Sequence, residues 1–98
     1  MARFDVYRTA SGAMLLDCQT DFLSGIETRL VAPLMPADQA GPMLPRLNPV
    51  FEIGGTRVAM MTTLLVGIPK TELGKRIGSL ADEQTTIMNA IDMLLSGF

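Results

Sequence analysis

The sequence predicts a mainly β domain (α+β class) that ends in one α-helix, and three observations predict it. Apolar and polar residues alternate in short runs, as in half-buried strands. Gly54 and Gly55 separate two apolar runs, as in a tight hairpin. From residue 80 the apolar period becomes that of a helix. A chain of 98 residues suits one domain, residues 1–98, with a single modest core.

The first expected element is a hairpin. Residues 4–9 alternate and predict a half-buried strand, and residues 13–18 predict its partner across a turn at residues 10–12. Residues 29–34 are apolar and partly β-branched, so they predict a third strand. Pro33 and Pro36 should end that strand, because proline lacks the N–H that a ladder needs.

Residues 36–49 are rich in proline and are expected to form a long loop. The expected hairpin follows, with strands at residues 50–53 and 56–63 around the two glycines. A further short strand at residues 64–68 should stop at Pro69.

Residues 80–95 predict the helix. Asp82 and Glu83 suit its positive N-terminal end, and Gly97 suits its C-terminal stop. The residues expected on its buried face are Leu80, Gln84, Ile87, Met88, Ile91, Leu94 and Leu95.

Composition excludes several kinds of chemistry. The chain has no histidine, which removes imidazole bases, His-containing triads and His metal ligands. Its single cysteine, Cys18, lies in an apolar run and is expected to be an inert core thiol. Asp17 and Asp21 are expected to be solvated or capping carboxylates rather than an acid–base pair. The residues therefore indicate no histidine-based catalysis and no metal site, and we expect no cofactor.

Charge and hydropathy narrow the expected partners. Eight basic and ten acidic residues give a net charge of −2 without a block of either sign, so direct, sequence-specific nucleic-acid binding is not expected. Lys70, Lys75 and Arg76 form one basic cluster, expected to be a solvated face. The longest uncharged stretch, residues 58–69, is too short to span a bilayer, and no targeting signal is evident. We expect a cytoplasmic protein.

A set of residues in order along nearly the whole chain resembles the CcdB family of bacterial toxins. The most specific parts are the Met60–Thr63 run (Met-Met-Thr-Thr) and a final helix followed by Gly97 and one apolar residue. The other matching residues are Phe4, Val6, Tyr7, Asp17, Gln19, Asp21, Val31, Pro33, Leu34, Pro49, Val50, Ile53, Gly54, Pro69, Asn89, Ala90, Ile91, Met93 and Leu94.

The resemblance implies a homodimer of SH3-like barrels, each with an antiparallel sheet, a small inserted sheet and one C-terminal helix. It implies a toxin that is not an enzyme but a topoisomerase poison, which binds the gyrase A protein of DNA gyrase and traps the cleaved-DNA complex. A cognate, CcdA-like antitoxin would neutralise it. The residues that the resemblance assigns to gyrase are Phe22, Leu23, Asp92, Leu95, Ser96, Gly97 and Phe98. Those that it assigns to the antitoxin are Arg8, Thr9, Ala10, Ser11 and Gly12.

One residue and one loop depart from the family pattern. Ser96 stands where the pattern has a tryptophan that anchors the toxin on gyrase, and the chain contains no tryptophan. Phe98 is a candidate for a substitute aromatic contact. The first hairpin loop is also about three residues shorter than the family pattern has it, which bears on antitoxin pairing.

Two alternative functions follow. One is a CcdB-like dimer that no longer poisons gyrase and binds only its antitoxin. The other is an endoribonuclease on a similar barrel, which without histidine would rely on an arginine and a hydroxyl, for example Arg29 and Thr63. A hydrophobic content of 48% also predicts apolar surface left over for a symmetric dimer contact.

Overall fold

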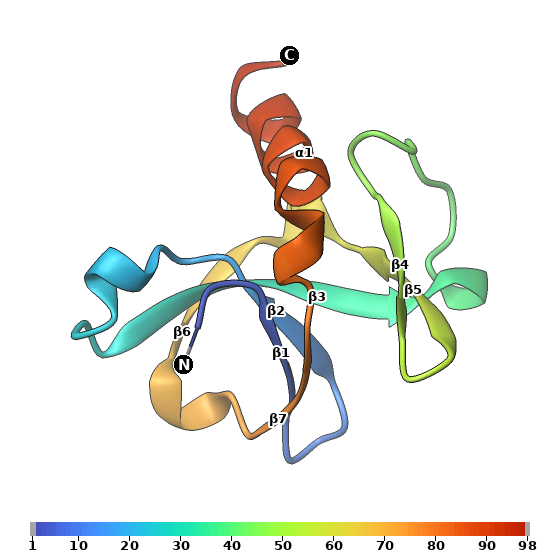
Figure 1. Ribbon diagram of the computed structural model, residues 1–98. Coiled ribbons are helices and arrows are strands. Elements are labelled where there is room, and N and C mark those ends of the chain that lie inside the picture. The colour runs from blue at the N-terminus through green and yellow to red at the C-terminus, as the bar shows by residue number, and fades with distance from the viewer. Residues whose placement is uncertain (1, 98) are drawn as a thin grey trace.

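The computed structural model describes residues 2–97, and its main feature is a strongly curled antiparallel sheet with a helix standing on one face (Figure 1). The sheet order is β4-β5-β3-β2-β1-β7, and β6 pairs with β3. The strands and the helix are β1 (Asp5–Arg8), β2 (Met14–Asp17), β3 (Thr28–Pro36), β4 (Val50–Ile53), β5 (Thr56–Met60), β6 (Val66–Pro69), β7 (Lys75–Ser79) and α1 (Gln84–Ser96). Short 3₁₀ turns are η1 (Asp21–Leu23), η2 (Ala37–Gln39), η3 (Thr62–Leu64), η4 (Lys70–Glu72) and η5 (Ala81–Glu83).

Both predicted hairpins are confirmed, although β5 ends at Met60 instead of continuing to residue 63. β1 pairs with β2 in the register Val6↔Leu16, and β4 pairs with β5 in the register Phe51↔Val58. Gly54 and Gly55 take φ values of 56° and 82°, which are the positive values that a two-residue turn requires. The inserted β4–β5 hairpin is continuous with the main sheet, since β5 also pairs with the second half of β3.

The expectation that Pro33 ends the third strand is wrong, because β3 continues through Pro33 to Pro36. Successive residues of a strand turn their backbone polar groups to opposite sides. The carbonyl of Leu30 accepts from Cys18 on the β2 side, whereas the carbonyl of Pro33 accepts from Met61 on the other side. On that side β3 changes partner, from β6 up to Val31 to β5 from Leu34 onward. The missing N–H of Pro33 therefore falls where no ladder bond is needed.

Strand β7 was not predicted. Its sequence contains one large apolar residue, Ile77, and two cations, and it forms the edge of the sheet beside β1. The predicted basic cluster is exposed at Lys75 and Arg76, as expected for a solvated face, but those two residues belong to this strand.

Only glycine fits at position 74, immediately before β7, because of its backbone conformation and its close neighbours. Its φ is +79°, and a Cβ there would overlap the carbonyl oxygen of Arg8 and lie 2.9 Å from Cα of Thr9. We expect Gly74→Ala to lower the free energy of unfolding by about 2–4 kcal/mol, measured by urea denaturation. The matched control is Gly12→Ala, where φ is also positive at +91° but no atom lies within 4 Å. Equal losses at both positions would contradict the role of the close contact.

The main core lies between the sheet and α1. It is formed by buried apolar side chains of β1, β2, β3, β4 and β5 together with Ile87, Ala90 and Ile91 of the helix. The predicted buried face was partly wrong, since Gln84, Leu94 and Leu95 are exposed and Ala90 is buried in their place. The inner turns of α1 contact the sheet, while its C-terminal turn extends away from it (Figure 1). Asp92, Leu94, Leu95 and Ser96 at that end of the helix are exposed.

Candidate functional site

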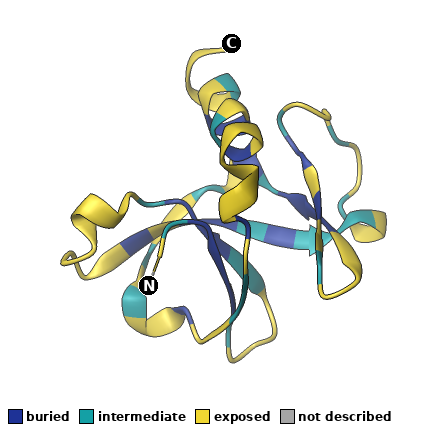
Figure 2. Ribbon diagram, viewed as in Figure 1, coloured by how far each residue is buried: buried dark blue, intermediate teal, exposed yellow. Residues whose placement is uncertain are grey.

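The C-terminal end of α1 is the first part of the candidate site. Asp92, Leu95, Ser96 and Gly97 are all exposed there, and Leu95 is 74% exposed (Figure 2). Gly97 ends the helix in a left-handed conformation, with a φ of 76°, and its N–H donates to the carbonyl of Met93 at 3.0 Å. Phe98, which the sequence assigned to this site, lies outside the described residues. The helix end therefore presents a large aliphatic side chain on a rigid support.

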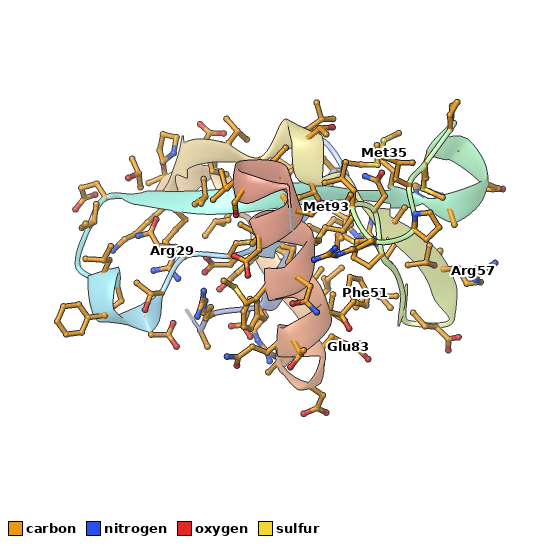
Figure 3. All side chains as sticks on the ribbon, turned by 90° about the horizontal axis from the view of Figure 1, so that it is seen from above. Arg29, Met35, Phe51, Arg57, Glu83 and Met93 are labelled. Carbon is orange, nitrogen blue, oxygen red and sulfur yellow. The ribbon has the colours of Figure 1, made fainter. Side chains whose placement is uncertain are left out.

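The second part is the η1 turn. Phe22 is 92% exposed, and Leu23 is also exposed. Asp21 fixes the turn, because its carboxylate accepts the backbone N–H of Arg3 at 2.7 Å. Figures 1 and 3 both show η1 well to one side of the C-terminal end of α1. Within one chain, the residues assigned to gyrase thus lie on two separate surfaces.

A buried ion pair lies beneath η1 and corrects the expectation for Asp17. Arg29 and Asp17 are both fully buried, and Nη2 of Arg29 lies 2.6 Å from Oδ2 of Asp17. Nε of Arg29 donates to the same carboxylate at 3.0 Å, and Nη2 also donates to the carbonyl of Gln19. Asp17 is therefore not solvated, although its Oδ1 also accepts the backbone N–H of Gln19 at 3.1 Å and so caps the start of the loop. Asp21 is, as expected, largely exposed, with its Oδ1 3.9 Å from Nη2 of Arg29.

Gln19 ties the η1 loop to the sheet, a role that the sequence did not indicate. Its side-chain amide donates to the carbonyls of Leu23 and Thr28, and its amide oxygen accepts the backbone N–H of Leu30. These bonds link both ends of the loop to the start of β3. Because a loop of this kind has few apolar contacts of its own, Gln19 and the ion pair together determine where Phe22 is held.

The first hairpin loop, residues 8–12, was assigned to the antitoxin and is well ordered by its own hydrogen bonds. The Thr9 hydroxyl accepts the backbone N–H of Ala13 and is 2.9 Å from the Ser11 hydroxyl. Arg8, Ala10, Ser11 and Gly12 are exposed, and Thr9 is partly buried. A groove of about 600 Å³ runs along one side of the loop, between it and the segment from Ile68 to Gly74. Loop and groove together offer a surface for a partner chain.

The residues suggested for ribonuclease chemistry do not form a shared site. Arg29 is fully buried in its ion pair, and Thr63 is exposed on η3 beside the loop residues Leu44 and Leu47. Cys18 is buried, and burial, followed by the nearby Asp17 carboxylate, raises the pKa of its thiol to about 12. At neutral pH it therefore stays protonated and unreactive.

Residues 2–97 bring together no group of three or more histidine, cysteine, aspartate or glutamate side chains that could hold a metal ion. None of the helices in the same part of the chain is both long enough and apolar enough to cross a membrane.

A curled half-barrel sheet with one C-terminal helix, and with exposed apolar side chains at the helix end and on η1, defines a mainly β protein of the CcdB-like fold class. The family model described as "CcdB protein" matches residues 3–97. The chain belongs to the CcdB family, a family of toxins from toxin–antitoxin pairs.

A solved structure shares this fold. It is described as "Endoribonuclease from Mycobacterial species", and the similarity has a TM-score of 0.76 at 17% sequence identity. The match covers 97% of this chain and 90% of the other. At 17% identity, this similarity shows a shared fold alone.

Proposed function

We propose that this protein poisons DNA gyrase by binding the gyrase A protein with the C-terminal end of α1 and trapping the enzyme on cleaved DNA. One observation carries the proposal. Leu95 is 74% exposed at a helix end whose other residues, Asp92, Ser96 and Gly97, are exposed as well. A large apolar side chain on a rigid helix offers contact area at little entropic cost, as interface anchors do.

A cleavage assay tests this proposal. Supercoiled plasmid, gyrase from the source organism, ATP and this protein are incubated, and the reaction is stopped with detergent and protease. We expect linear DNA, the product of a trapped cleavage complex. Normally supercoiled plasmid would favour the alternative of a CcdB-like dimer that binds only its antitoxin, since Ser96 replaces the tryptophan of the family pattern.

The proposed active form is a homodimer. Apolar surface supports it, because large exposed apolar side chains remain on several elements of the isolated chain. They are Phe22, Leu23, Ile26, Leu30, Leu44, Val50, Leu64, Val66, Leu94 and Leu95. Two copies would also supply the two helix ends that a symmetric target such as a pair of gyrase A proteins requires. We expect sedimentation equilibrium at micromolar concentration to give the mass of a dimer, and the mass of one chain would contradict the proposal.

The proposed antagonist is a cognate antitoxin that contacts the first hairpin loop, residues 8–12. The exposed residues of this loop and the groove beside it support this assignment. The proposed setting for all these partners is the cytoplasm, where gyrase acts.

A second candidate function is RNA cleavage, which is favoured because a solved structure with the same fold is described as an endoribonuclease. Arg29 and Thr63 do not support it, since Arg29 is enclosed by the protein. The same preparation incubated with RNA separates the two candidates. Intact RNA together with linear plasmid supports gyrase poisoning, whereas cleaved RNA with unbroken plasmid supports the nuclease.

A further inference from the structure

The edge of the sheet at β7 is open. β7 pairs with β1 on one side, and no backbone hydrogen bond in residues 2–97 links residues 75–79 to another strand on the other side. An edge of this kind presents free N–H and C=O groups, which can pair with an extended chain.

A bulge in β7 shapes the surface beside that edge. Tyr7 pairs with Arg76 and Val6 with Gly78, so that Ile77 has no partner on β1. Bulges of this kind often redirect a side chain next to a functional surface. Ile77 is partly buried and lines a groove of about 500 Å³, whose other lining residues are Arg8, Thr9, Ala10, Gly74 and Lys75.

The charge at the groove is positive. Arg8 and Lys75 are cross-strand partners, both are exposed, and neither forms an ion pair within residues 2–97. The third cation, Arg76, lies 3.1 Å from the buried Asp5 carboxylate and is neutralised by it. Two uncompensated cations therefore flank an apolar contact point at an open strand edge.

We propose that the β7 edge binds an extended acidic peptide, which adds a strand to the sheet. Its backbone pairs with β7, its carboxylates lie near Arg8 and Lys75, and an apolar side chain contacts Ile77. The same positive charge repels the β7 edge of a second copy and so disfavours self-pairing. The natural ligand would be the proposed antitoxin, because an antitoxin bound at residues 8–12 would lie next to this edge. This assignment rests on the proposed function.

Binding is tested with the ¹⁵N-labelled wild-type protein and the peptide Glu-Glu-Val-Val-Glu-Glu-Val-amide, which carries fluorescein on its N-terminal nitrogen. Because successive side chains of a strand point to opposite faces, this sequence alternates Glu with Val along each face. We expect amide shifts concentrated in residues 74–79 and 8–12. Lys75→Glu should weaken binding by about tenfold, because it replaces attraction by repulsion. The matched control is Arg57→Glu, because Arg57 is exposed on β5 and does not line the groove, and it should change binding by less than about twofold.

Three further probes separate strand addition from simple charge attraction. A peptide of the same sequence with every backbone nitrogen methylated should not bind, since neither of its edges can donate N–H groups to the ladder. A Lys-Val peptide should not bind either. Equal binding of the methylated peptide, tighter binding of a single-stranded uridine decamer, or shifts confined to another surface would each overturn the proposal. No gyrase or antitoxin is present, so a failure here is distinct from a failure of gyrase poisoning.

Discussion

Asp17→Ala is expected to lower the free energy of unfolding by about 3–5 kcal/mol, which for a chain of this size lowers Tm by roughly 15–30 °C. Asp17 and Arg29 are fully buried and joined by hydrogen bonds of 2.6–3.2 Å. Removing the carboxylate leaves a guanidinium charge in the interior, and Nη1 of Arg29 already has no hydrogen-bond partner. Urea denaturation at a fixed protein concentration measures the loss, since dimer formation would make stability depend on concentration.

The matched control is Asp21→Ala, because the Asp21 side chain is 58% exposed and 3.9 Å from Arg29. It should cost less than about 1 kcal/mol. The double variant Asp17→Leu with Arg29→Met should be more stable than Asp17→Ala alone, because no charge remains buried. Similar losses for Asp17→Ala and Asp21→Ala would show that the buried pair does not have the role inferred from its geometry.

The second large effect concerns activity. If the proposed function holds, Leu95→Asp should raise the concentration of protein needed for half-maximal plasmid linearisation by at least about thirtyfold. A charge at this helix end would have to be desolvated on binding gyrase, whereas in the free protein Leu95 is mostly in water. The free energy of unfolding should change by less than about 0.5 kcal/mol.

Leu44→Asp is the matched control for Leu95→Asp. Leu44 is 57% exposed, on the loop before β4, so the same substitution is made at a surface to which no role in gyrase binding is assigned. Leu44 is also one of the exposed apolar residues that support the dimer, so sedimentation is measured for this variant and should give the mass of the unsubstituted protein. Its plasmid cleavage should then equal that of the unsubstituted protein. Full activity of Leu95→Asp, or equal losses in both variants, would remove the end of α1 from the proposed interface.

The strands that the sequence predicted correctly are those whose signals are local. Alternation identified β1 and β2, and the paired glycines identified the β4–β5 turn. Strand β7 was not predicted because Ile77 is its single large apolar residue, and an edge strand needs few such residues. The path of β3 through Pro33 depends on a change of neighbouring strand, from β6 to β5, that no local pattern records.

One part of the candidate site was also predicted from the sequence, and another part was not. The exposed end of α1 was identified as a site through the family resemblance, although the helical period alone assigned Leu95 to the buried face. The Asp17–Arg29 pair was missed because its two residues are 12 positions apart and meet only after β2 and β3 pair. Spacing along the chain does not indicate a contact that the sheet register creates.

The position of β1 between β2 and β7 sets the order in which this protein can assemble during translation. The ribosome makes β1 first, but its second partner, β7, ends only at Ser79, immediately before the helical segment. A nascent chain that stops earlier has β1 as an open edge, and pairings so distant in sequence form slowly. The sheet therefore cannot be completed before β7 has been made, and chains that stop before Ser79 lack both the complete sheet and the helix end.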